Sequence, residues 1–153
     1  IFGISIIAIF SFLIILGILT ETSFLPNTYV QKGTELSEKN KIELINHKII
    51  EKNDNILFFY SDGFLSLLES GQIITDDKII RYAKNEEKFL EIYEMKLKHV
   101  KEIVLEEQGF AFSDSIYKVI GNEYSEYEFI RIILSTEDNK DQDFINAIKK
   151  RMN

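Results

Sequence analysis

The stretch ILFFYSDGFLSLLESGQIITDDKIIRY, residues 56–82, decides the fold class of this chain. Short apolar runs alternate there with turn residues, a texture typical of antiparallel strands. Asp62-Gly63 is its strongest hairpin signal, and further turns are expected at Ser70-Gly71 and Asp76-Asp77. The strands predicted from these turns cover residues 56–61, 64–68, 72–75 and 78–82.

The same texture continues towards the C-terminus. It predicts four more strands, at residues 89–95, 100–106, 115–120 and 127–134. About eight short strands at this spacing indicate a mainly-β barrel or sandwich.

The end of the chain is predicted to be an amphipathic helix over residues 136–152, capped by Ser135 or Thr136. Its early turns are acidic and its last turn is basic, which matches the helix dipole. Phe144, Ile145 and Ile148 form its apolar stripe. We expect this stripe to cover an open end or face of the sheet.

Residues 34–52 are predicted to form another amphipathic helix, capped by Thr34 or Ser37. One face of it carries Ile42, Ile45 and Ile49. The preceding residues 21–33 contain the only proline of the chain and show no apolar periodicity, so they indicate a tether.

The first twenty residues, IFGISIIAIFSFLIILGILT, carry no charge and have no polar stripe. At about 1.5 Å per residue, a helix of this length spans about 30 Å, the thickness of a bilayer core. No small-residue cleavage site follows, so an uncleaved single-pass anchor is favoured over a signal peptide. The residues expected inside the bilayer are Ile4, Ile7, Phe10, Leu13, Ile14 and Leu16. The flanking charges balance, so the side of the soluble domain stays open, with the periplasmic side preferred.

All 18 basic and 25 acidic residues lie in residues 21–153, which therefore carry the whole net charge of -7. Such an acidic domain is a poor nucleic-acid binder. Residues 76–101 are its least acidic part. Six basic residues there are candidates for contact with anionic lipid or with a partner: Lys78, Arg81, Lys84, Lys96, Lys98 and Lys101. The alternative is that these side chains only solubilise outward strand faces, since acidic residues are interspersed.

No catalytic constellation is evident. His47 and His99 lie in charged surroundings without a motif, and no G-x-S-x-G occurs. The absence of cysteine excludes thiolate metal sites, and the carboxylate pair Asp76-Asp77 is explained by turn chemistry. We expect no enzyme, no cofactor and no small-molecule substrate.

The order of the predicted strands, closed by one C-terminal amphipathic helix, resembles the outline of a bacterial pleckstrin-homology-like (PH-like) domain. The resemblance is most specific at TDDKIIRY, Thr75 to Tyr82, which is similar to the Thr-x-x-Lys/Arg-hydrophobic-hydrophobic element of such domains. It covers roughly residues 53–153. It implies a docking module, often joined to a membrane segment, and it suggests the bacterial inner membrane. Residues 54–69 contain no basic residue, so binding of phosphoinositide headgroups is not carried over.

The sequence therefore predicts a non-catalytic, membrane-anchored interaction module, an accessory subunit of a larger membrane protein assembly. The alternative is a peripheral reader of anionic headgroups that uses Lys78 to Lys101. An open sheet edge near Phe89 to Met95 is the expected partner surface, where Glu91 and Glu94 would admit a basic strand. The competing interpretation is that the helix near Leu36 to Ile50 covers this edge.

Overall fold

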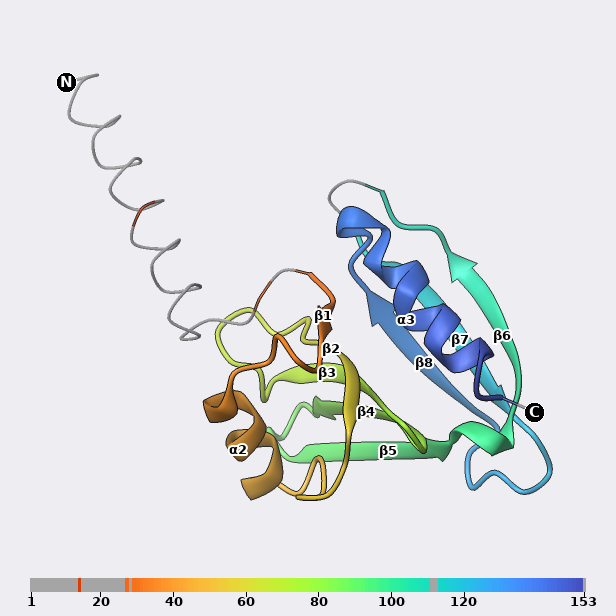
Figure 1. Ribbon diagram of the computed structural model, residues 1–153, viewed down its shortest axis with the longest axis horizontal. Coiled ribbons are helices and arrows are strands. Elements are labelled where there is room, and N and C mark those ends of the chain that lie inside the picture. The colour runs from red at the N-terminus through yellow and green to blue at the C-terminus, as the bar shows by residue number, and fades with distance from the viewer. Residues whose placement is uncertain (1–13, 15–26, 28, 111–112, 153) are drawn as a thin grey trace.

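The computed structural model describes residues 14, 27, 29–110 and 113–152 of the chain (Figure 1). The predicted membrane segment, residues 1–20, lies outside the described residues except for Ile14. No helix within the described part is long and apolar enough to cross a membrane.

Eight strands within the described residues form two antiparallel sheets (Figure 1). The first sheet has the order β1-β2-β3-β4-β5, with β1 at Gln31–Lys32, β2 at Ile56–Tyr60, β3 at Ser70–Thr75, β4 at Lys78–Lys84 and β5 at Leu90–Lys96. The second has the order β6-β7-β8, with β6 at Val100–Glu107, β7 at Ser115–Gly121 and β8 at Phe129–Leu134. The helical elements are α2 at Glu38–Asn46, η1 at Leu97–His99, η2 at Glu137–Asn139 and α3 at Lys140–Lys149. The predicted mainly-β class with a C-terminal helix is confirmed.

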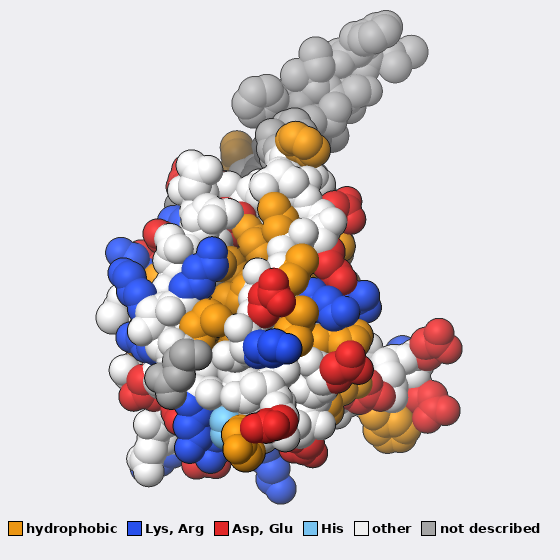
Figure 2. All heavy atoms as spheres, turned by 90° about the vertical axis from the view of Figure 1, so that its right-hand side faces the viewer, with side chains coloured by type: hydrophobic (Ala, Val, Ile, Leu, Met, Phe, Trp, Pro, Cys, Tyr) orange, Lys and Arg blue, Asp and Glu red, His pale blue; other side chains and the backbone are white. Residues whose placement is uncertain are grey.

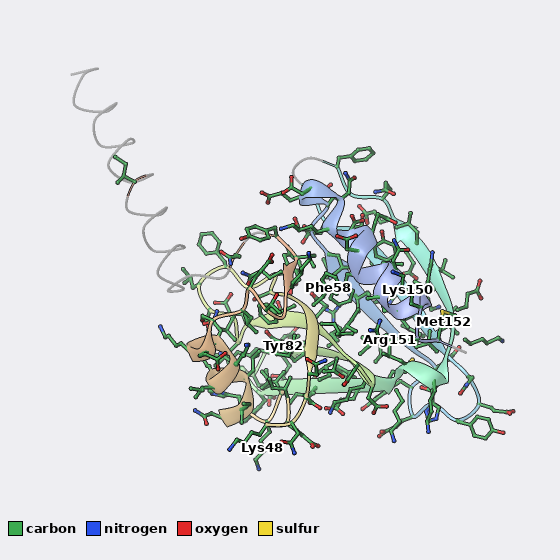
Figure 3. All side chains as sticks on the ribbon, viewed as in Figure 1. Lys48, Phe58, Tyr82, Lys150, Arg151 and Met152 are labelled. Atoms are coloured by element: carbon green, nitrogen blue, oxygen red, sulfur yellow. The ribbon has the colours of Figure 1, made fainter. Side chains whose placement is uncertain are left out.

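The larger core lies between the two sheets and α3. Phe144, Ile145 and Ile148 of α3 are at most 2% exposed and pack against buried residues of both sheets, as the apolar stripe predicts. Phe58 of β2 faces α3 (Figure 3), with its ring centroid 6.3 Å from that of Phe144. The helix therefore fills the space that the two sheets leave open between them.

A second core covers the other face of the five-stranded sheet. Leu44 of α2 packs there with Ile73 and Ile80 of the sheet. Tyr82 is fully buried in the same core, and its hydroxyl donates a 2.6 Å hydrogen bond to the carbonyl oxygen of Leu67 (Figure 3). Strands β3 and β4 thus have apolar side chains on both faces, because each face is covered by protein.

The strand predicted at residues 64–68 was wrong. The Glu69 carboxylate accepts the backbone N–H of Phe64 at 2.7 Å, and the Ser61 hydroxyl donates to the carbonyl oxygen of Ser70 at 2.8 Å. These side-chain bonds hold residues 61–69 as a loop instead of the tight turn that Asp62-Gly63 suggested. Leu67 and Leu68, at the end of this loop, are both buried.

The N-terminal helix is shorter than the predicted 34–52. Ser37 caps it, accepting the N–H of Asn40 at 3.2 Å. Of the predicted apolar face, Ile42 is 56% exposed, Ile45 is half-buried against the second core, and Ile49 is buried beyond the end of the helix. The backbone N–H of Ile49 donates to the carbonyl oxygen of Leu44 at 2.9 Å. The preceding residue, Lys48, has a φ of 58° and reverses the chain direction there.

The end of the predicted tether belongs to the sheet. Gln31 and Lys32 pair with Phe59 and Phe58 of β2. Gly33 follows at a point where a Cβ atom would collide with the carbonyl group of Ile56. Only glycine permits this close approach of the two backbones.

One hydrogen bond joins the two sheets near the end of β2. The hydroxyl of Tyr60 donates to Oδ2 of Asp114 at 2.9 Å, just before β7. Burial raises the pKa of the Asp114 carboxyl. The hydrogen bond from Tyr60 lowers this pKa and the nearby charge of Asp62 raises it, and the net shift is upward. The folded protein therefore holds the proton of Asp114 more tightly than the unfolded chain does.

This shift gives a pH-dependent stability. Because the folded pKa is raised, stability falls as pH rises from the ordinary carboxyl value through the folded value. We expect Asp114→Asn to be more stable than the parent at pH 7, and equal to it at a pH below both values. Urea denaturation at both pH values measures this, with Asp76→Asn in the exposed β3–β4 turn as the control. Equal stability of Asp114→Asn and the parent at pH 7 would contradict the assignment.

Candidate docking site

β5 is an edge strand of the five-stranded sheet. It pairs with β4 along Leu90 to Lys96 and ends the strand order. The helix α2 packs on a face of this sheet, where its Leu44 meets Ile73 and Ile80. The outer side of β5 therefore offers backbone groups to a further strand.

The register shows which residues of β5 point outward. Leu97 N–H donates to the carbonyl oxygen of Asp77 at 2.8 Å, which makes this a hydrogen-bonded pair. Such pairs alternate along an antiparallel ladder, so Glu91, Tyr93 and Met95 bond to β4. The residues whose N–H and C=O groups point away from β4 are therefore Leu90, Ile92, Glu94 and Lys96.

The hydrogen bonds on the β3 side of β4 indicate the same alternation of hydrogen-bonded and non-hydrogen-bonded pairs. The N–H of Lys84, which lies opposite Leu90, donates to the carbonyl oxygen of Glu69 at 2.7 Å, on the β3 side. Leu90 and Lys84 are thus a non-hydrogen-bonded pair. Before β5, the carbonyl oxygen of Phe89 accepts the N–H of Asn85 at 2.9 Å, so the open edge begins at Leu90.

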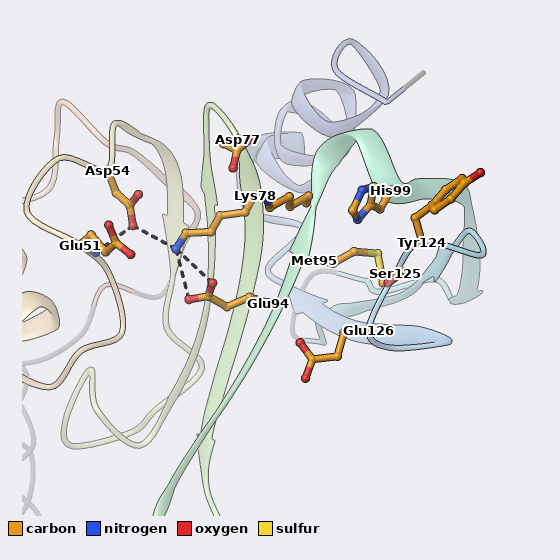
Figure 4. Close-up of a pocket in the computed structure, with 11 residues that line it drawn as sticks. Glu51, Asp54, Asp77, Lys78, Glu94, Met95, His99, Tyr124, Ser125 and Glu126 are labelled. Atoms are coloured by element: carbon orange, nitrogen blue, oxygen red, sulfur yellow. Dashed lines mark hydrogen bonds and ion pairs between the residues drawn. The ribbon is translucent and has the colours of Figure 1, made fainter.

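A cleft of about 490 Å³ adjoins the C-terminal end of β5 (Figure 4). It lies between the five-stranded sheet and the β7–β8 loop. Five carboxylates and two lysines line it. The carboxylates belong to Glu51, Asp54, Asp77, Glu94 and Glu126, and the lysines are Lys78 and Lys96. The cleft is therefore acidic overall.

Lys78 is one of the two lysines that line this acidic cleft, and its positive charge is already engaged by carboxylates of the protein. Its Nζ lies 3.1 Å from Oε2 of Glu94 and 3.5 Å from Oδ2 of Asp54, and its side chain is only 13% exposed (Figure 4). Burial alone would lower the pKa of Lys78, but the bonds and charges of Glu94 and Asp54 outweigh it and raise that pKa. The lysine is a fixed cation whose charge two carboxylates already compensate.

The six basic residues predicted as a contact surface are brought together only in part: Lys78 and Lys96 lie opposite each other on β4 and β5 and both line the cleft. Lys78 is held in the ion pairs just described. Arg81 points to the other face of β4, where it donates a 2.6 Å hydrogen bond to the carbonyl oxygen of Arg131 on β8. Lys84 is six residues from Lys78, about 20 Å along the strand. The exposed members near the β5–β6 corner are Lys96, Lys98 and Lys101.

Each of the two histidines contacts a neighbouring group of the protein. Nδ1 of His47 lies 3.0 Å from the carbonyl oxygen of Glu43, and the ring of His99 lies 6.3 Å from that of Tyr124.

The backbone N–H groups of Asp77 and Lys78 bond to the hydroxyl of Thr75, at 3.3 and 3.1 Å. This closes the turn of the Thr-x-x-Lys element. Across the described residues, no group of three or more His, Asp or Glu side chains is arranged to hold a metal ion.

Sequence reasoning found the edge but missed the cleft. The edge is expected because a PH-like sheet closes incompletely, and residues 89–95, FLEIYEM, are its candidate position, where Glu91 and Glu94 interrupt the apolar residues. The cleft is assembled from four segments of the chain, represented by Asp54, Asp77, Glu94 and Glu126. Only the tertiary structure brings these charges together.

Comparison with known proteins supports the fold. No family model matches the chain, and no curated protein matches it in sequence. The chain is similar in structure to a DUF1696 family protein with a pleckstrin-homology domain from Shewanella loihica, with a TM-score of 0.54 and 10% sequence identity. The match covers 82% of this chain and 98% of that one. The predicted PH-like fold is confirmed at this level.

Proposed function

We propose that this chain is a non-catalytic interaction module, held in a bacterial inner membrane by residues 1–20, that docks an extended basic segment of another membrane protein subunit. It would serve as an accessory subunit of that assembly, with its domain on the periplasmic side. The observation that carries the proposal is the outer side of β5, which no strand of the described residues pairs with, beside an acidic cleft.

The edge favours a strand as the ligand. Four residues of β5 present N–H and C=O groups outward, and a partner strand would satisfy them about 4.8 Å away. Phe89, which is 65% exposed at the start of this edge, offers it an apolar contact.

The charges select a basic ligand. Glu91 and Glu94 are exposed on β5, so pairing of two copies through this edge would bring like charges together. A strand with Lys or Arg would instead meet these carboxylates and those of the cleft beyond. This complementarity is the reason for naming a basic partner.

A proline substitution tests the role of the backbone. In Ile92→Pro the lost N–H is one that points away from β4, so the inner ladder is kept. We expect the full chain carrying Ile92→Pro to lose its co-purifying subunit after gentle solubilisation from the native membrane. Ile92→Ala, which shortens the same side chain but keeps the N–H, should retain it. Native gel size and mass spectrometry give the readout.

Two results would overturn the proposal. One is a wild-type protein that runs as a lone monomer under these conditions. The other is equal loss of partner in Ile92→Pro and Ile92→Ala, which would assign the effect to the side chain. Thermal melts of both variants establish that the domain is folded.

The peripheral lipid reader remains the alternative proposal. It has less support, since the basic residues are dispersed and Lys78 is already paired. On the face that carries α3 and the second sheet, basic and acidic side chains are interspersed (Figure 2). Binding of the domain to vesicles that rises with anionic lipid content would favour this alternative.

A further inference from the structure

Three large apolar side chains stand out in solvent at one end of the domain. Phe64 is 81% exposed, Leu65 is 63% exposed and Phe110 is 75% exposed. Phe64 and Leu65 belong to the β2–β3 loop, and Phe110 follows β6. Burying one such side chain contributes about 1.5–3 kcal/mol, so their joint exposure indicates an interaction surface.

The backbones that carry these side chains are held in place. Besides its bond to Phe64, the Glu69 carboxylate lies 3.4 Å from the N–H of Leu65. The N–H of Phe110 donates to the hydroxyl of Ser113 at 2.9 Å, and its carbonyl oxygen accepts the hydroxyl of Thr136 at 3.0 Å. The apolar groups are thus presented on fixed backbone.

The two segments belong to the same end of the molecule. Tyr60, which precedes the β2–β3 loop, is bonded to Asp114, which follows the segment of Phe110 along the chain. Tyr124 is also 72% exposed, but it lies beyond the other end of β7, which starts at Ser115 and ends at Gly121. Seven strand residues, about 23 Å, separate these ends.

The N-terminal segment enters the domain at the end of Phe64 and Phe110. Gln31 pairs with Phe59, so Tyr29 comes level with Ser61 at the start of the β2–β3 loop. The Nζ of Lys140, at the start of α3, lies 4.2 Å from the centroid of the Tyr29 ring. The last residue of the apolar segment, Thr20, precedes Tyr29 by nine residues, which reach about 30 Å at most.

We propose that Phe64, Leu65 and Phe110 insert into the interface of the same bilayer that holds residues 1–20. The proposal rests on the anchor of the proposed function, because the short connection keeps this end of the domain near the membrane. Aromatic and aliphatic side chains suit the boundary between headgroups and acyl chains. Asp62 and Glu69 flank Phe64 and Leu65, so the contact depends on apolar insertion and needs no anionic lipid.

The absence of tryptophan from the chain provides a clean test. Single tryptophans replace Phe64, Phe110, Tyr124 or Phe10 in four variants of the full chain. Each is reconstituted into phosphatidylcholine vesicles with and without brominated lipid. The bromines lie near the headgroup end of the acyl chains for the three domain variants, and near the chain ends for Phe10→Trp, because Phe10 is in the middle of residues 1–20. Because interfacial groups are buried about 5–10 Å, we expect Phe64→Trp and Phe110→Trp to lose about half of their emission or more. Tyr124→Trp should be unaffected.

Phe10→Trp separates the two proposals. If it is quenched while Phe64→Trp and Phe110→Trp are not, the anchor stands and the insertion of the loops is refuted. If Phe10→Trp is not quenched and the protein does not stay with the vesicles, the anchor itself fails. Equal quenching of Tyr124→Trp would also overturn the proposal, because contact would then not be confined to one end. Replacing phosphatidylcholine by anionic lipid should leave the pattern unchanged.

Discussion

Ending the chain at Ser135, so that α3 is removed, is expected to unfold the whole domain. Phe144, Ile145 and Ile148 contribute three fully or almost fully buried side chains to the core between the sheets. Truncating one such residue to alanine costs about 2–5 kcal/mol. The stability lost with all three side chains therefore approaches or exceeds the typical net stability of a domain, about 5–15 kcal/mol. Far-UV circular dichroism and thermal melting of residues 21–135 measure the outcome.

A single substitution checks the cause. Phe144→Ala in the full chain should lower the free energy of unfolding by about 3–5 kcal/mol, since it leaves a cavity beside Phe58. Lys149→Ala, on the exposed face of the same helix, should change it by less than about 0.5 kcal/mol. A soluble 21–135 fragment that melts cooperatively would show that α3 is dispensable for the fold.

Asp141→Ala is expected to be the most damaging substitution of a polar residue. Asp141 is 2% exposed, and its Oδ2 accepts the hydroxyl of Tyr117 at 2.8 Å and the side-chain amide of Gln142 at 3.1 Å. The alanine leaves the buried Tyr117 hydroxyl without its acceptor. Losing a hydrogen bond to a charged group costs about 1.5–3 kcal/mol, and we expect a loss of stability in this range. Urea denaturation measures it.

Two variants control this result. Asp143→Ala removes an exposed carboxylate from the same turn and should have little effect, which excludes the helix dipole as the cause. The pKa of Tyr117 offers a second readout: burial and then Asp141 raise it to about 12, so it should fall in Asp141→Ala. If Asp141→Ala and Asp143→Ala were equally stable, the buried bond would contribute nothing.

Most of the strands could be predicted because their alternation reflects burial directly. β4 is an exception to this alternation, since its adjacent residues Ile79 and Ile80 serve opposite cores, and it was predicted from the turn before it, which Thr75 fixes. The β2–β3 connection could not be predicted. Its conformation depends on the Glu69 carboxylate and the Ser61 hydroxyl, whose bonds to the backbone leave no periodic signal.

Local sequence also misled on the first helix. Ile42 and Ile45 have helical spacing, but the helix is placed by Leu44, which fits the face of the sheet. The edge strand could be proposed because a PH-like sheet closes incompletely. The separation of Lys78, Arg81 and Lys84 could not be predicted, because it depends on which face and which end of β4 each residue occupies.

The order of the first sheet has a mechanical consequence. The N-terminal chain joins the sheet at β1, one edge, while the proposed docking strand is β5, the opposite edge. Tension between the membrane and a docked subunit would therefore cross every ladder of this sheet in series. A partner strand running along β5 would load these ladders in shear, so that many hydrogen bonds resist together. If both the anchor and the docked strand are as proposed, the domain would transmit a pull from one edge of the sheet to the other.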